Sequence, residues 1–330
     1  MRNHPGALLL RKVRALFIGA ATVVLAAGSA LAQSAADKYP ERPVKIIVPF
    51  APGGSTDILA RVIGQKMTEN WGQQVIVETR PGAATVVGTG AAAKADPDGY
   101  TLIIVVSNHT TNPALHDTMQ YDAVKDFEPV SLLGRAPTVF YVNPAFPPKD
   151  LKELIAFGKT KPVPFGSAGI ASMTHLAAET FKADNGVELM QHVVYRGGSP
   201  ALNDVLAGTI PMTAATVTQA LPQWQSGLVR ALGVTAAERH RSLPGVPTFR
   251  EQGSDLVVTE WYGLLAPAGT PKPIIAKLNA EMRRILALPL GERVAAIDLV
   301  GSSPEELGQF IRGEIERWSP VIKKLGLKAQ

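Results

Sequence analysis

The stretch from Val44 to Asp57 constrains the fold more than any other part of this chain. Its sequence, VKIIVPFAPGGSTD, begins with an apolar run that is typical of a buried strand and continues into a Pro-Gly-Gly turn. A helix is expected to follow at once, with Ser55 or Thr56 as its N-cap. A strand, a glycine turn and a helix in this order indicate an α/β fold.

The same junction suits an anion. The end of a parallel strand opens toward the ligand crevice of an α/β domain, and the free N–H groups of a first helical turn carry partial positive charge. The residues therefore predict that a carboxylate-like group binds at this turn. A tight connection without any ligand would use the same residues, so the stretch alone leaves both interpretations open.

The first 32 residues have the pattern of a secretory signal peptide. Four basic residues precede an apolar run from Ala15 to Ala27, and Ala30-Leu31-Ala32 forms an A-x-A site. The run has 13 residues, whereas a membrane-spanning helix needs about 20. Export to the periplasm with cleavage after Ala32 is therefore expected.

Composition excludes several classes of function. Removing residues 1–32 lowers Lys plus Arg from 33 to 29 against 28 acidic residues, so the expected mature chain is near +1 and offers no basic face for nucleic acid. The remaining 298 residues (330 − 32) suit two domains. The chain contains no cysteine, which excludes disulfides, thiolate catalysis and cysteine-based metal sites.

Two long extended segments suggest that the chain crosses between two lobes. They span 127–143 and 257–266, and alternating strands and helices lie on either side of them. A second strand-to-glycine junction, Val163 to Gly169, repeats the logic of the first. A polar cluster, Ser107 to Thr111, follows the apolar strand from Tyr100 to Val106, where ligand contacts are expected in a parallel sheet. Two facing junctions would clamp a small anion.

The motifs of common enzymes are incomplete. In Gly197-Gly198-Ser199-Pro200-Ala201 the last glycine of a G-x-S-x-G elbow is replaced by alanine, and proline lacks the N–H that an oxyanion hole requires. Gly88-Thr89-Gly90 has no third glycine and follows no strand, so it is no dinucleotide motif. No histidine pair is spaced by four residues, which argues against a metal site.

Taken in order along the chain, the motifs resemble those of one family, the Bug-type solute receptors of the tripartite tricarboxylate transporters. The resemblance covers nearly all of the expected mature chain and rests on PFAPGGSTD, VETRPGA, PDGYTL, NPAL, AVKDFEPV, FGSAG, THLAAE, YRGGSPALNDVLAG, RALGVT, LPGVPTFREQG, WYGLLAPAGTPKPII and PEELGQFIRGEIERW.

This resemblance implies a two-lobed periplasmic binding protein of the type II, Venus-flytrap class, in which each lobe is a mixed sheet flanked by helices. One lobe would comprise 33–139 and 260–330, and the other 140–259, joined by two crossovers. The implied ligand is a small organic carboxylate, such as a di- or tricarboxylate, an acidic amino acid or an aromatic acid. Membrane transporter subunits or a sensor kinase would be the partners of a monomer that has no cofactor, metal or catalytic residue.

The resemblance also implies a set of ligand-lining residues, supported by Tyr195 and Asp204. The chain departs from the family's usual pattern in three places. Asn108 and His109 stand where smaller residues are common and admit an imidazole contact, residues 211–219 lack the usual aromatic or acidic side chains of the pocket wall, and the chain is shorter before Phe165 and before Ser302. Arg80 and Arg196 are candidates for ion pairs with the ligand, although a solvated place suits each equally. A periplasmic serine-type hydrolase acting on small carboxylate esters is the alternative function. The implied contacts are Phe50, Ala51, Gly53, Gly54, Ser55, Thr56, Asp57, Ser107, Asn108, His109, Thr110, Gly166, Ser167, Ala168, Thr174 and His175.

Overall fold

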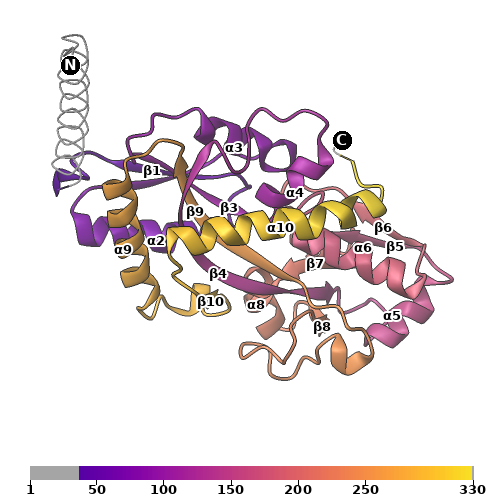
Figure 1. The fold of residues 1–330 in the computed structure, drawn as a ribbon. Helices are drawn as coiled ribbons and strands as arrows, with labels where there is room; N and C mark the ends of the chain where they lie inside the picture. The colour runs from indigo at the N-terminus through magenta and orange to yellow at the C-terminus, as the bar shows by residue number, and fades with distance from the viewer. Residues whose placement is uncertain (1–36, 329–330) are drawn as a thin grey trace, which may run out of the picture.

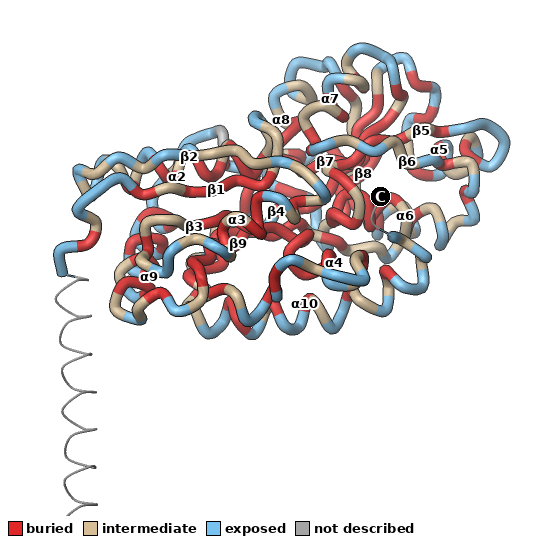
Figure 2. The backbone as a smooth tube through the Cα atoms, turned by 90° about the horizontal axis from the view of Figure 1, so that it is seen from above, coloured by how far each residue is buried: buried red, intermediate tan, exposed pale blue. Residues whose placement is uncertain are grey.

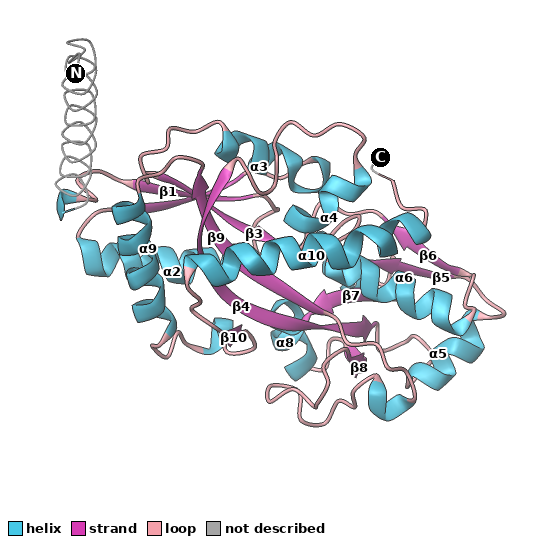
Figure 3. Ribbon diagram, viewed as in Figure 1, coloured by secondary structure: helices cyan, strands magenta, loops and turns pink. Residues whose placement is uncertain are grey.

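The computed structural model describes residues 37–328, so the expected signal peptide and its cleavage after Ala32 lie outside the described residues. Within that range, strands and helices alternate along most of the chain (Figure 3). The strands are β1 (Val44–Val48), β2 (Val75–Thr79), β3 (Thr101–Val106), β4 (Phe127–Val142), β5 (Val163–Gly166), β6 (Met190–Val193), β7 (Met212–Thr216), β8 (Arg230–Val234), β9 (Thr259–Pro267) and β10 (Asp298–Leu299).

The helices lie between these strands, and a long one follows the last strand. They are α2 (Ser55–Trp71), α3 (Val86–Ala93), α4 (Asn108–Leu115), α5 (Leu151–Gly158), α6 (Met173–Asn185), α7 (Gly198–Leu206), α8 (Val217–Gln225), α9 (Lys272–Leu286) and α10 (Pro304–Lys324), with short 3₁₀ turns η1 (Ala83–Thr85), η2 (Arg250–Gln252) and η3 (Glu292–Val294).

The strands form two mixed regions that share β4. In the first, β1 pairs in parallel with β2 and β3, and β9 runs antiparallel between β3 and β4. In the second, β5 pairs in parallel with β6 and β7, while β7 and β8 run antiparallel to β4. The parallel pairs require helical crossovers, and these helices cover the sheet faces.

Strand β4 joins the two regions. Its residues from Phe127 to Pro137 pair with β9, and those from Thr138 to Val142 pair with β7. Two register shifts interrupt the pairing with β9, and such bulges increase the local twist of a strand. The extended segments predicted at 127–143 and 257–266 are therefore the two connections of a two-lobed fold, as expected. The lobe boundaries at 139 and 259 stay a prediction.

The core of the first lobe lies on both faces of its sheet. Ile46 packs with the apolar side chains of α2 and α9, whereas Ile47 points to the opposite face, toward Leu307 and Ile311 of α10. This alternation follows from the two-residue repeat of a strand, and each fully buried isoleucine contributes about 1.5–3 kcal/mol. Figure 2 shows the buried strands enclosed by exposed segments.

Helix α10 connects the lobes by packing. It begins with the predicted cap, in which Ser303 and Glu306 form a capping box and Pro304 occupies the first turn. From there it runs along the molecule toward α6 (Figure 1), where Trp318 and Ile322 join a cluster with residues of that helix. The last helix thus spans elements of both lobes.

Some predicted elements differ from the structure. The apolar residues around 290–297 predict a helix from the sequence. This prediction is wrong, because Gly291 adopts φ of 84° and only the 3₁₀ turn η3 forms before β10 pairs with β4. The strand expected at 192–195 lies at 190–193, where it pairs with β5. The polar residues after β3 form the N-cap and the first turn of α4.

Candidate functional site

Four helices begin at one small cavity between the lobes. They are α2, α6, α7 and α8, and the cavity volume is about 30 Å³, more than the roughly 10–15 Å³ that one water molecule needs. We call it the 30 Å³ cavity. Its lining residues come from the first turns of these helices and from the adjacent strand ends: Phe50, Ala51, Gly54, Ser55, Thr56, Val106, Ala168, Thr174, Gly197, Gly198, Thr216, Gln219 and Glu260.

Three of these helix starts have no side-chain cap. The N-caps are Gly54 for α2, Gly197 for α7 and Thr216 for α8, and none of them accepts a bond from its own first turn. The expected capping by Ser55 or Thr56 is wrong, because the chain turns helical one residue earlier and both side chains lie inside the first turn. Uncapped first turns leave N–H groups and positive dipole ends directed at the cavity, which suits an anion.

Several polar side-chain atoms at these helix starts have no partner within the described residues. Thr216 Oγ1 and Gln219 Nε2 are buried atoms without a hydrogen bond, and both residues line the 30 Å³ cavity. Ser199 Oγ is also unpartnered and lies against the glycine turn, because a Cβ built on Gly53 would stand 3.6 Å from it. Buried groups of this kind normally have a partner, so they are available to a ligand.

Glu260 is the one carboxyl group among the lining residues. It is 4% exposed, and its Oε1 accepts hydrogen bonds from Ser107 N at 3.0 Å and from Trp261 N at 3.1 Å. Burial raises its pKa to about 7, with a smaller contribution from the carboxylate of Glu314. Near neutral pH this group is therefore divided between its neutral and charged forms.

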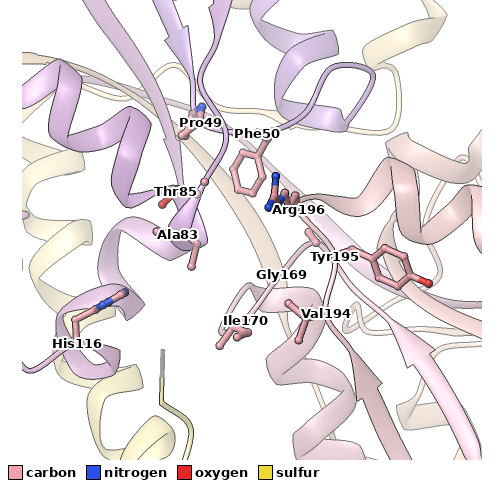
Figure 4. A pocket seen from close by; sticks show the side chains of 13 residues that line it. Pro49, Phe50, Ala83, Thr85, His116, Gly169, Ile170, Val194, Tyr195 and Arg196 are labelled. Carbon is pink, nitrogen blue, oxygen red and sulfur yellow. The ribbon is translucent and has the colours of Figure 1, made fainter. Parts of the chain in front are cut away.

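A second cavity of about 230 Å³ lies beside the first, and we call it the 230 Å³ cavity (Figure 4). Both cavities share Phe50 and Ala168 as lining residues. Its other walls come from five separate segments of the chain, and they include the side chains of His116 and Arg196. The residues of these walls are Pro49, Gly82, Ala83, Ala84, Thr85, His116, Gly169, Ile170, Val194, Tyr195 and Arg196.

The loop from Ala83 to Thr85 forms one wall in an unusual conformation. All three residues have positive φ, at 45°, 48° and 81°, which costs energy for residues other than glycine. Asn112 of α4 holds the loop, since its Nδ2 donates to Ala84 O at 2.8 Å and to Thr85 Oγ1 at 3.2 Å. The strain is therefore maintained by a contact from a helix at the lobe junction.

The predicted ligand residues fall into two groups. Tyr195 lines the 230 Å³ cavity through its backbone region, while its ring points away (Figure 4) and its hydroxyl donates to Asp204 Oδ2 at 2.6 Å. Arg196, a candidate for an ion pair with the ligand, also lines the 230 Å³ cavity. The remaining predicted residues that line a cavity surround the 30 Å³ one: Phe50, Ala51, Gly54, Ser55, Thr56, Ala168 and Thr174.

Two predicted residues of the first turn support it instead of lining either cavity. Asp57 accepts a hydrogen bond from Gly53 N at 2.9 Å and forms an ion pair with Arg61 at 3.0 Å. The carboxylate thus bonds to its own turn, where it complements the helix dipole. Arg80, a candidate for the ligand, is paired with Glu78.

The polar cluster after β3 joins the lobes. Asn108 Nδ2 donates to Ile170 O at 3.0 Å, and Ser107 Oγ accepts from Met173 N at 3.2 Å. Thr110 Oγ1 donates to Ser107 O within the same turn. These residues line neither cavity, because they are buried between α4 and the start of α6.

His109 also lies outside the two cavities. Its Nε2 is 2.7 Å from Ala123 O, and its ring packs against Tyr121 and Phe127. Complete burial lowers its pKa to about 4, so the imidazole is neutral at pH 7. The imidazole contact admitted from the sequence is made to the protein's own backbone.

Of the second glycine junction, Ala168 lines the 30 Å³ cavity, whereas the residues next to it are buried in the protein. Ser167 Oγ lies 2.8 Å from His192 Nε2, whose ring stacks on that of His175 at 3.9 Å, and His175 Nδ1 accepts from Ala171 N. A Cβ at Gly166 would stand 2.7 Å from that of Ala201, so close packing requires this glycine. Ser167 is fully buried, which leaves a substrate no access to its hydroxyl.

Sequence reasoning missed part of the lining. Gly197, Gly198, Thr216, Gln219 and Glu260 were not predicted, although they surround the same cavity. The Gly197-Gly198 pair resembles Gly53-Gly54, and this resemblance is the signal that could have identified it as a second glycine turn at the site. For the other three residues no local pattern distinguishes a ligand contact from an ordinary strand end or helix start.

Between residues 37 and 328, no group of three potential ligand side chains could hold a metal ion. Over the same range, we find no helix with the length and apolar character that crossing a membrane demands.

Comparison with known proteins identifies the family. A model described as the tripartite tricarboxylate transporter family receptor, TctC, matches residues 59–327. The chain belongs to this family. One curated relative is the protein BugT of Bordetella pertussis strain Tohama I, which is 35% identical over 314 residues that cover 93% of this chain and 96% of BugT.

Three solved structures have the same fold as this chain. The periplasmic binding protein BugD has a TM-score of 0.84 at 34% identity, covering 88% of this chain and 100% of BugD. Rpa4515 of R. palustris, solved with adipate, has a TM-score of 0.84 at 32% identity, with 88% and 99% covered. MatC of Rhodopseudomonas palustris, solved with malate, has a TM-score of 0.80 at 34% identity, with 86% and 100% covered. The chain is a solute-binding receptor with the two-lobed fold.

Proposed function

We propose that this receptor captures a small organic carboxylate between its lobes and delivers it to the membrane subunits of a tripartite tricarboxylate transporter. The observation that carries the proposal is the convergence of four helix N-termini on the 30 Å³ cavity, three of them without a side-chain cap. Adipate and malate, bound by the neighbours Rpa4515 and MatC, are both carboxylates and support this ligand class.

The ligand occupies both cavities, with a different part in each. One carboxylate occupies the 30 Å³ cavity, within reach of the first-turn N–H groups, Thr216 and Gln219. The body of the ligand extends into the 230 Å³ cavity past Phe50 and toward Arg196, which is placed for a second acidic group. Charge-assisted hydrogen bonds contribute about 1.5–3 kcal/mol each, so several are needed for the roughly −8 kcal/mol of micromolar binding.

The proposal also covers the boundaries and closure of the lobes, the location of the protein, its oligomeric state and its partner. The lobes are 33–139 with 260–330, and 140–259, and they close on the ligand to exclude water. The receptor is a periplasmic monomer, exported by cleavage after Ala32, and the periplasmic neighbours support this location. A sensor kinase is an alternative reader of the closed form, and a transport assay in a deletion strain separates the two partners.

Calorimetric titration tests the ligand class. The mature, ligand-stripped protein is titrated with adipate, malate, citrate, glutamate and benzoate, and we expect one-to-one binding of at least one acid. Thr216→Val should weaken this binding about tenfold, because it removes a hydroxyl from the cavity. Thr213→Val, on the same strand and outside both cavities, is the matched control and should bind as the wild type does. A panel in which no acid binds would refute the proposal.

A further inference from the structure

We propose that Glu260 is the proton-binding residue of the ligand site, so that the receptor takes up one proton with the carboxylate wherever Glu260 is ionised before binding. This inference rests on the proposed function, because it assigns a role to the one carboxyl group that lines the 30 Å³ cavity. A carboxylate at this position would otherwise repel the ligand, so its presence beside uncapped helix starts requires an explanation.

The backbone holds Glu260 at the junction of the lobes. Its Oε1 accepts from Ser107 N and Trp261 N at 3.0 and 3.1 Å. Ser107 Oγ in turn accepts from Met173 N, at the start of α6 in the other lobe. The carboxyl group is therefore fixed beside the cavity and linked to the contact between the lobes.

No cation neutralises this carboxyl group. Within residues 37–328, no basic side chain forms an ion pair with Glu260, and the charged group that acts on it is the carboxylate of Glu314 on α10. Tyr262, on the same strand, is itself buried and neutral. The remaining ionisable groups on the surrounding elements are engaged elsewhere: Asp57 with Arg61, His109 with Ala123, His175 with Ala171, and Arg135 over the ring of Phe310.

Burial and the neighbouring carboxylate already favour the neutral acid, and a bound anion favours it further. When the ligand carboxylate enters, ionised Glu260 takes one proton from solvent. The neutral carboxyl then donates its O–H to a ligand oxygen, while Oε1 keeps accepting from the backbone. A buried acid that stays neutral in order to donate is a known device in anion recognition. The burial-raised pKa of about 7 places the change within the neutral pH range.

Calorimetry in buffers of different ionisation enthalpy counts the protons. The five acids of the panel are titrated at pH 6 in MES and in imidazole, and at pH 8 in HEPES and in Tris. For the wild type we expect uptake near zero at pH 6 and near one proton at pH 8. Between pH 7.5 and 8.5 the Kd should rise about tenfold, provided that ligand binding keeps the proton on Glu260.

Two variants identify the residue. Glu260→Gln keeps an oxygen that accepts from Ser107 N and imitates the neutral acid, so proton uptake should disappear and Kd should become constant between pH 6 and 8.5. If Glu260 served only to accept hydrogen bonds from Ser107 N and Trp261 N, Glu260→Gln would take up as many protons as the wild type. Glu281→Gln is the control, because Glu281 is also a buried glutamate but lies on α9 and lines neither cavity. It should retain the uptake.

The outcomes separate this inference from the proposed function. If a carboxylate binds without proton uptake, or if Glu260→Gln retains the uptake, the role of Glu260 is overturned while the receptor function stands. If none of the five acids binds, the proposed function fails and this inference fails with it.

Discussion

Glu260 illustrates how a single residue can link stability to pH. In the folded state its pKa is about 7, above the value of 4.5 for an exposed glutamate, so the folded protein binds more protons between these pH values. The stabilisation is therefore complete below about pH 4.5 and is lost as the pH rises through 7. Between pH 5 and 8, the wild type should lose on the order of 3 kcal/mol of unfolding free energy relative to Glu260→Gln.

Urea unfolding of the ligand-free protein at both pH values measures this difference. Glu188→Gln, an exposed position, is the control and should follow the wild type at both pH values. If the unfolding free energies of the wild type and Glu260→Gln change equally between pH 5 and 8, the carboxyl group of Glu260 is already ionised at pH 5 in the folded state.

At the scale of elements, the site depends on how the first turns of α7 and α8 meet. A Cβ on Gly198 would overlap the side-chain amide of Gln219, so only glycine leaves that amide in place at the cavity. Gly198→Ala should displace Gln219 and weaken carboxylate binding about tenfold or more, since a hydrogen bond to the charged ligand is lost. The thermal unfolding temperature should change much less than the affinity.

Calorimetry and thermal unfolding of the same preparation check this prediction. Gly245→Ala is the matched control, because a Cβ there meets no atom within 4 Å and its φ is not positive. Equal affinities for the two alanine variants would mean that Gln219 does not contact the ligand.

At the scale of the whole molecule, α10 and α4 hold the lobes in one arrangement. Ile322 packs in a cluster with α6 residues, whereas Ile311 packs with the sheet of the first lobe. Either change to alanine should destabilise the protein by about 2–4 kcal/mol through the cavity that it leaves. Only Ile322→Ala should also weaken ligand binding several-fold, because it removes a contact between the lobes that the proposed closure would need.

Denaturant unfolding and carboxylate titration of the two variants give both quantities. The prediction about closure would be wrong if Ile311→Ala and Ile322→Ala bound the ligand equally well.

Local patterns were sufficient for much of the fold. Apolar periodicity and turn residues predicted β1, α2 and the crossing segments, because each depends on residues that are close in sequence. They failed at 290–297, where an apolar pattern suggested a helix but Gly291 and the pairing of β10 with β4 decided otherwise. The cap predicted for α2 at Ser55 or Thr56 failed for a related reason, since extended backbone at Gly54 moved the cap by one residue.

The sequence by itself determined that the chain is α/β, that it crosses twice between lobes and that glycine turns precede several helices. The tertiary structure decided which of those turns share a cavity. Gln219 and Glu260 reach the 30 Å³ cavity because β4 carries the chain into the second lobe and β9 returns it, which brings α7 and α8 opposite Gly54. Such convergence depends on strand pairing between residues more than 100 positions apart, and no local pattern encodes it.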